Sequence, residues 1–183
     1  MSSITGVPEI TYIIVNLSPA DHDGDIRMSD PITIDDISPE EPLDECAQRI
    51  IVGYFKEMMS YKKGVCDDTT IEFVHDMRVA SRRLRAAMDN FAVCFEQEKF
   101  KSLYKQVKII TQTMGSVRDL DVLIRRFKTE LMTLPNDKQK DIELLIEHLI
   151  EKRKDERKPM LDLFKSLDDS KFENEFLRFF EVV

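Results

Sequence analysis

Apolar and polar residues alternate with a helical period along most of the chain after residue 40. The clearest stretch runs from Val74 to Phe95, where apolar side chains recur three and four residues apart. This spacing places the apolar side chains on one face of a helix and leaves the opposite face polar. Similar segments follow one another with short connections, which favour antiparallel neighbours. The pattern therefore predicts an all-α fold, an antiparallel up-and-down helical bundle with a long central helix.

Turn and cap residues divide this pattern into separate helices. We expect the first helix to begin near Pro42 and to end at Gly64, because glycine tolerates the positive φ of a helix C-terminus. Residues 67–70 offer N-caps for the next helix, which should run to about Phe95. A long helix over about 99–134, a charged helix over about 137–167 and a short helix to about 181 complete the expectation. Pro159 should kink or split the charged helix.

The first forty residues differ from the rest of the chain. Ile10 to Leu17 is rich in β-branched and aromatic residues, which predicts a short strand. Asp21 to Asp25 faintly resembles a calcium loop, but Ile32 occupies the twelfth position, where an acidic ligand is needed. We therefore expect no metal site there. We divide the chain into an N-terminal tail or edge segment, residues 1–40, and a helical domain, residues 41–183.

Charge is distributed unevenly along the sequence. The net charge is −8, yet residues 70–128 contain 12 basic and 7 acidic residues. A basic centre between acidic flanks indicates a local anion site and not a general coat for nucleic acid. The three cysteines form no CxxC pair, which favours a reducing compartment. No secretory signal and no long apolar run is present, so we expect a cytoplasmic protein with no membrane span.

The basic residues of this centre follow two helical lines. On the helix that begins near residue 72, His75, Arg78, Arg82 and Arg85 lie within about 80° of one another, opposite the apolar face. On the following helix a second line contains Lys101, Lys105, Lys108, Gln112, Asp119 and Arg126. Arginine forks bind phosphate oxygens in pairs, and lysine supplies a mobile positive charge. The lines predict a basic patch that binds an anion; a solvated charged surface, neutralised by the acidic helices, is the alternative.

Two motifs on these lines resemble the CHAD family, the conserved histidine α-helical domain. The first is His75-x-x-Arg78-Val79-x-x-Arg82-Arg83-Leu84-Arg85, and the second runs from Met114 to Val122 with Arg118-Asp119 at its centre. The resemblance covers residue 42 to the C-terminus. It implies a helical bundle whose basic surface binds inorganic polyphosphate, and a location on polyphosphate granules. The binding residues it implies are His75, Arg78, Arg82, Arg83, Arg85, Lys105, Lys108 and Arg118, with Asp119 orienting an arginine.

The sequence departs from the family in one respect. A full domain of this kind resembles two related helical halves, each with its own His/Arg helix, whereas this sequence has one such helix. Either the chain is a half-length member, with a second copy in a homodimer supplying the other half, or it is a fragment.

No catalytic motif accompanies the basic lines. The sequence has no Gly-rich phosphate loop, no nucleophile elbow and no paired metal carboxylates. We therefore predict a non-enzymatic protein that binds polyphosphate and needs no cofactor and no metal. A structural adaptor that binds an acidic protein partner is the alternative function. Nucleic acid is disfavoured by the net negative charge and because neither motif has aromatic residues between its basic ones to stack on bases. A phosphate near His75 would favour its protonated form, so binding should strengthen at lower pH.

Overall fold

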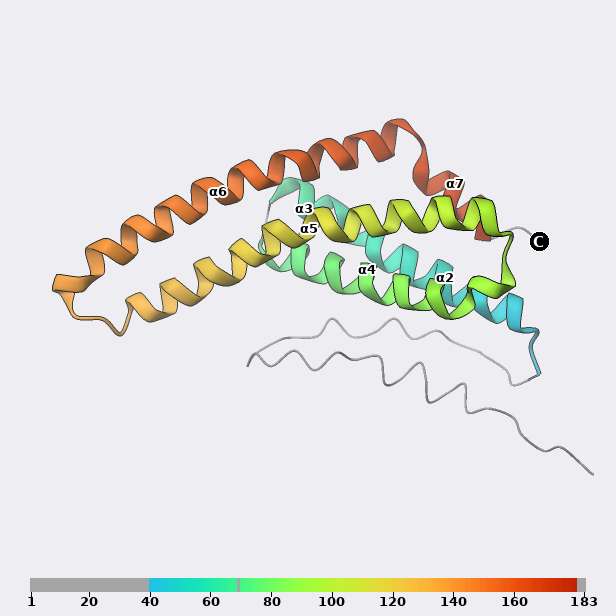
Figure 1. Ribbon diagram of the computed structural model, residues 1–183, viewed down its shortest axis with the longest axis horizontal. Helices are drawn as coiled ribbons and strands as arrows, with labels where there is room; N and C mark the ends of the chain where they lie inside the picture. Colours follow the sequence, from blue (N-terminus) through green and yellow to red (C-terminus); the bar gives the residue numbers. More distant parts are fainter. Residues whose placement is uncertain (1–39, 69, 181–183) are drawn as a thin grey trace, which may run out of the picture.

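Figure 1 shows the computed structural model, which describes residues 40–68 and 70–180, except for the side chains of residues 136–138. All regular structure in these residues is helical, as the sequence predicts. The elements are α2 (Leu43–Ser60), α3 (Lys62–Asp67), α4 (Glu72–Phe91), the 3-10 helix η1 (Ala92–Cys94), α5 (Gln97–Leu131), α6 (Asn136–Asp169) and α7 (Phe172–Phe180). The predicted strand at residues 10–17 and the acidic turn at residues 21–25 lie outside the described residues.

The main core lies between α2, α4 and α5, and α7 closes one end of it (Figure 1). Phe55, Met77 and Ile110 come from three different helices and are fully buried. The ring of Phe55 stacks on that of Phe176 with 3.9 Å between centroids, which ties α7 to α2. Burial of such side chains contributes about 1.5–3 kcal/mol each, so this core fixes which face of each helix turns inward.

The long helices α5 and α6 form a hairpin that extends beyond α2 and α4 (Figure 1). A second, smaller apolar cluster of Leu120, Ile124 and Leu149 holds this extension together. Helix α6 continues through Pro159, so the expectation of a split helix is wrong. Met160 and Phe164 are buried in the main core just after this proline, and their packing offsets the hydrogen bond that proline cannot donate.

Three predicted helix ends are also corrected. Helix α2 ends at Ser60, and Gly64 lies inside α3. The Phe73 ring packs so close to Gly64 that a Cβ atom at this position would clash with the ring. The positive φ of 50° belongs instead to Asp68, which follows α3. The N-cap of α4 is Ile71, with no side-chain cap, and not a residue of 67–70. Helix α4 ends at Phe91, because the chain tightens into η1 before α5.

Candidate functional site

Helix α4 separates its apolar and basic residues as its periodicity predicts. Met77, Ala80 and Leu84 have no exposed surface and face the core. Arg82, on the other face, is exposed. The remaining residues of that line are half-buried, namely His75, Arg78 and Arg85. The basic line is therefore partly sheltered from water, which strengthens its interaction with an anion compared with a fully exposed line.

Arg85 is held against α5 by an aromatic residue. Its Nη2 donates to the hydroxyl of Tyr104 at 3.4 Å, and its guanidinium carbon lies 5.7 Å from the centre of the Tyr104 ring. The Tyr104 hydroxyl in turn donates to Asp89 on α4 at 3.1 Å. Nε of Arg85 is buried and has no hydrogen-bond partner among the described residues. The contact orients Arg85 and leaves one of its donors unmet.

Arg118 brings the second motif to the first. It is half-buried on α5, and burial, together with the positive charges of Arg125 and Arg78, lowers its pKa below the ordinary arginine value, although Glu72 and Asp121 oppose this shift. The Arg78 charge acts on it across the α4–α5 contact. Nη1 of Arg118 and Nε of Arg78 are buried without a hydrogen-bond partner among the described residues. Buried donors without a partner cost about 1–3 kcal/mol each, so the fold retains them at an energetic cost.

Asp76 is an acidic residue within this basic region. It is half-buried on α4, and its pKa is raised above the ordinary aspartate value, first by burial and then by the negative charge of Glu72. The positive charges of Arg118 and Arg83 oppose this shift. Since the charge of Arg118 is close enough to act on the pKa of Asp76, the Asp76 carboxylate offsets part of the positive charge around Arg118.

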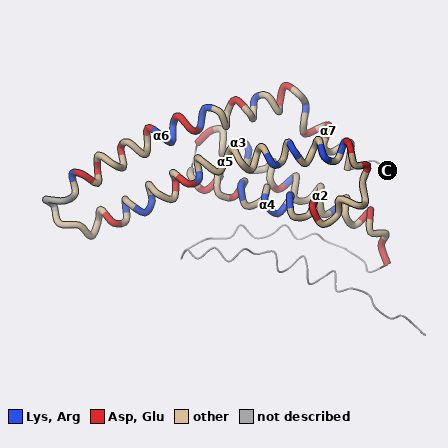
Figure 2. Tube along the Cα trace, viewed as in Figure 1, with Lys and Arg blue, Asp and Glu red and all other residues tan. Residues whose placement is uncertain are grey.

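The predicted lysines lie on the first half of α5, where Figure 2 shows several basic residues in succession. Lys105 and Lys108 are both exposed. Leu103, before them, and Val107, between them, are buried in the core. No hydrogen bond or ion pair connects either lysine to another residue in the described part of the chain. Their ammonium groups are thus available to a ligand that lies along α5.

Arg83 is directed to another part of the fold. Its Nη1 donates to Oε1 of Glu57 on α2 at 3.0 Å, and the Glu57 side chain is 3% exposed. Burial raises the pKa of Glu57, while Arg83 lowers it. The predicted binding role of Arg83 thus stays a prediction, and the contact it makes joins α4 to α2.

Asp119 and Asp121, both in the second motif, differ in exposure and in their contacts. Asp119 is exposed and makes no hydrogen bond or ion pair with the described residues, so its orienting role stays a prediction. Asp121 is 1% exposed and accepts a hydrogen bond from Nε of Arg153 on α6. Burial raises the pKa of Asp121, and the hydrogen bond from Arg153 opposes that shift. The second motif therefore supplies a structural carboxylate that the sequence did not single out.

Arg153 also belongs to a larger charge cluster. Its Nη1 and Nη2 donate to both carboxylate oxygens of Asp68 at 3.1 and 3.0 Å. Arg157 lies 3.0 Å from Asp68 and donates to the Val65 carbonyl oxygen at 3.2 Å. This cluster joins the loop before α4 to α5 and α6. The i, i+4 spacing of Arg153 and Arg157 indicates a common face, but their acidic partners are too distant in sequence to be inferred.

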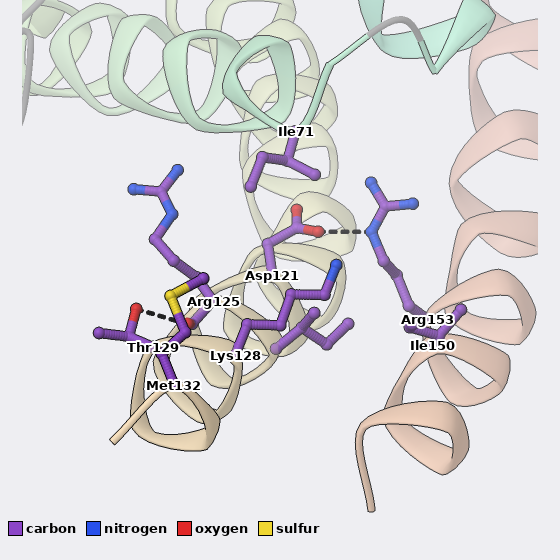
Figure 3. Close-up of a pocket in the computed structure, with 9 residues that line it drawn as sticks. Ile71, Asp121, Arg125, Lys128, Thr129, Met132, Ile150 and Arg153 are labelled. Atoms are coloured by element: carbon purple, nitrogen blue, oxygen red, sulfur yellow. Dashed lines mark hydrogen bonds and ion pairs between the residues drawn. The ribbon is translucent and has the colours of Figure 1, made fainter. Parts of the chain in front are cut away.

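A cavity of about 350 Å³ opens beside this cluster, at the start of the α5–α6 extension (Figure 3). Its walls are mainly apolar, from Ile71, Ile124, Met132 and Ile150. Arg125 and Lys128 also line it, and Arg125 is engaged in an ion pair with Glu72. None of the predicted binding residues lines this cavity, so the α4–α5 line is a separate surface.

Residues 40–68 and 70–180 contain no group of three or more His, Cys, Asp or Glu side chains placed to hold a metal ion. None of the helices in these ranges combines the length and the apolar composition needed to cross a membrane.

Comparison with known proteins gives one match. No curated protein matches this chain. A family model described as the CHAD domain matches residues 49–181, which include both His75-to-Arg85 and the second motif around Arg118. Because this match covers most of the sequence, the chain belongs to the CHAD family.

Proposed function

We propose that this protein binds inorganic polyphosphate, without catalysis, through what we term the α4–α5 basic set: His75, Arg78, Arg82, Arg85, Lys105, Lys108 and Arg118. CHAD domains are associated in general with polyphosphate binding, which supports the choice of ligand. We assign Arg83 to the support of α4, because Glu57 already occupies its guanidinium group. Cytoplasmic polyphosphate granules are the location that follows from this function.

One observation carries the proposal. Arg78 and Arg118 come from two helices, act on each other electrostatically, and each has a buried guanidinium nitrogen without a hydrogen-bond partner among the described residues. Like charges at close range and unmet donors both cost free energy. A phosphate group between them would reduce both costs at once, since its oxygens accept hydrogen bonds and its charge is negative.

The extent of the set favours a chain of phosphates over a single phosphate ion. From His75 to Arg85 the α4 line is about 15 Å long. Lys105 and Lys108 add exposed charges on the neighbouring helix. A linear polymer with a negative charge on every unit can contact these groups in succession, and each contact adds to the affinity. Binding should weaken as salt is added, because the outer contacts are screened.

Titration of the full chain with long-chain polyphosphate at fixed salt tests the proposal. The double substitution Arg78→Gln plus Arg118→Gln should lower affinity at least about tenfold, since charge-assisted hydrogen bonds contribute about 1.5–3 kcal/mol each. Arg126→Gln plus Lys154→Gln is the matched control: it removes the same charge from side chains that are 71% and 61% exposed. Equal losses in both variants, or equal affinity of the parent chain for single-stranded RNA, would refute the proposal.

A further inference from the structure

The segment before α2 has a charge opposite to that of the α4–α5 basic set. Residues 21–36 contain six aspartates and a single arginine, and no lysine. The aspartates are Asp21, Asp23, Asp25, Asp30, Asp35 and Asp36. Glu41, which follows them, is already bound to Arg49 on α2 and is left out of this group. The acidic segment, as we call residues 21–36, is thus a short polyanion on the same chain as a polyanion site.

The segment precedes α2, which begins at the end of the bundle where α5 carries Lys101 and Lys105. Helix α2 begins at Leu43, and α2 contacts η1, the short helix between α4 and α5. The charge of Asp44 raises the pKa of Cys94, after burial of that thiol, which places the start of α2 beside the connection. The chain therefore enters α2 close to the end of α4 that carries Arg85 and to the beginning of α5 that carries Lys101 and Lys105.

The segment is long enough to lie along the whole set. Arg78 is thirteen residues before the end of α4 at Phe91, which is about 20 Å along the helix axis. Sixteen residues, the length of the acidic segment, span at most about 55 Å, and six further residues connect it to Leu43. Attachment to the same chain gives it an effective concentration on the order of millimolar at the set.

The strength of the contact is limited by the exposure of its charges. Each ion pair between an aspartate and an exposed lysine or arginine contributes little, because both charges are solvated. Only six of the sixteen residues are aspartates, so the segment offers fewer negative groups per unit length than a chain of phosphates. A long polyphosphate can therefore displace the segment, whereas a short or sparsely charged anion competes poorly.

We propose that the acidic segment docks on the α4–α5 basic set when no polyanion is bound, and that ligands bind by displacing it. The docked chain then selects long, densely charged ligands, because weaker anions fail to overcome its effective concentration. The competition rests on the proposed function, whereas the docking itself does not. If about 80–90% of molecules are docked, the apparent dissociation constant rises about five- to tenfold.

The docking is tested on the full chain by carbodiimide cross-linking, which joins carboxylates directly to amines. Peptide mapping should find links from the acidic segment to Lys101, Lys105 or Lys108, and added polyphosphate or high salt should suppress them. Lys140 and Lys152 on α6 are exposed internal controls that should acquire few links. Absence of links to the α5 lysines, or equal linking to α6, overturns the docking whether or not polyphosphate binds.

The competition is tested by neutralising the acidic segment. A variant with all six aspartates changed to asparagine should bind short oligophosphates about five- to tenfold more tightly. The matched control changes six exposed acids of α6 to amides: Asp141, Glu143, Glu147, Glu151, Asp155 and Asp162. Equal gains in both variants overturn the competition. Links to α5 without any binding of polyphosphate would instead support the docking and refute the proposed function.

Discussion

Two groups of arginines in this bundle have opposite surroundings. Arg153 and Arg157 on α6 have side chains 11% and 8% exposed, and both contact the carboxylate of Asp68. Arg153 also binds Asp121. Arg78 on α4 and Arg118 on α5 are half-buried too, and each keeps a buried nitrogen without a hydrogen-bond partner in the described residues, as Arg157 also does. Unlike the α6 arginines, they form no ion pair with an acid in this part of the chain, and each repels the other.

The difference separates structural charge from charge that is available to a ligand. On α6 the carboxylates compensate the buried guanidinium groups, so the cluster joins three parts of the fold. Between α4 and α5 the compensation is incomplete: the charges of Asp76 and Glu72 act in this region, but among the described residues no hydrogen bond or ion pair joins either acid to the guanidinium group of Arg78 or Arg118. Incomplete compensation of this kind is typical of functional sites, where a ligand completes it.

The largest expected effect comes from removing a compensated arginine. Arg153→Ala leaves Asp121, which is 1% exposed, without its hydrogen-bond donor. Breaking one side of a buried ion pair costs about 3–5 kcal/mol, so the free energy of unfolding in urea should fall by that amount. Lys152→Ala, the exposed neighbour, should change it by less than about 0.5 kcal/mol. A loss below about 1 kcal/mol for Arg153→Ala would mean that the α6 cluster is not structural.

Substitution of Arg83 tests whether its ion pair with Glu57 is structural, like the ion pairs of Arg153 and Arg157 on α6. Burial raises the pKa of Glu57 above its ordinary value in the folded protein. The folded state therefore binds this proton more tightly than the unfolded state, and the free energy of unfolding falls as pH rises from the ordinary pKa to the raised one. Arg83→Ala removes the opposing charge and raises this pKa further. At pH 7 the variant should be about 1–3 kcal/mol less stable than the parent chain. Near pH 4 the difference should shrink, because Glu57 is then protonated in both folded proteins.

Urea denaturation across this pH range measures the effect. In a Glu57→Gln background the same arginine substitution should give a difference that does not depend on pH. Polyphosphate affinity should be nearly unchanged in Arg83→Ala if Arg83 supports α4. A loss of affinity as large as that of Arg78→Gln plus Arg118→Gln, with normal stability, would add Arg83 to the proposed α4–α5 basic set.

The two arginine groups also show what the sequence can predict. The core face of α4 follows from its helical period alone, and the structure confirms that these apolar residues are buried. The partners of individual arginines do not follow from it. Asp68 and Arg153 are 85 residues apart, and Arg83 and Glu57 are 26 apart, so their pairing depends on how the helices pack.

Gly64 illustrates the same limit for helix ends. Local propensity favours glycine at the end of a helix, which led to a wrong boundary. The residue lies inside α3 because the Phe73 ring of α4 packs against it. Glycine is needed at position 64 because of a tertiary contact between two helices, and the pattern within one helix does not reveal such a contact.

The smallest expected effect sharpens the comparison at the proposed binding residues. The positive charge of Arg118 acts on Asp76, and burial raises the pKa of Asp76 above the ordinary aspartate value. Asp76→Asn removes this charge at neutral pH, so polyphosphate affinity should rise about threefold, the size of one partly exposed ion-pair interaction. As pH falls, Asp76 of the parent chain becomes protonated and loses the same charge. The advantage of the variant should then disappear, while protonation of His75 strengthens binding in both proteins.

Calorimetric titration between about pH 7.5 and pH 4 measures both trends, since this range includes the ordinary histidine pKa and extends down close to the ordinary aspartate pKa, above which that of Asp76 is raised. Asp162→Asn on α6 removes an equal charge from an exposed position and controls for net charge. A constant advantage of Asp76→Asn at every pH would show that net charge alone acts. A lower affinity of the folded variant at neutral pH would show that Asp76 holds a basic side chain in place. The α4–α5 arginines would then be compensated by an acid, as those of α6 are. The difference between the two groups of arginines would lose its physical basis.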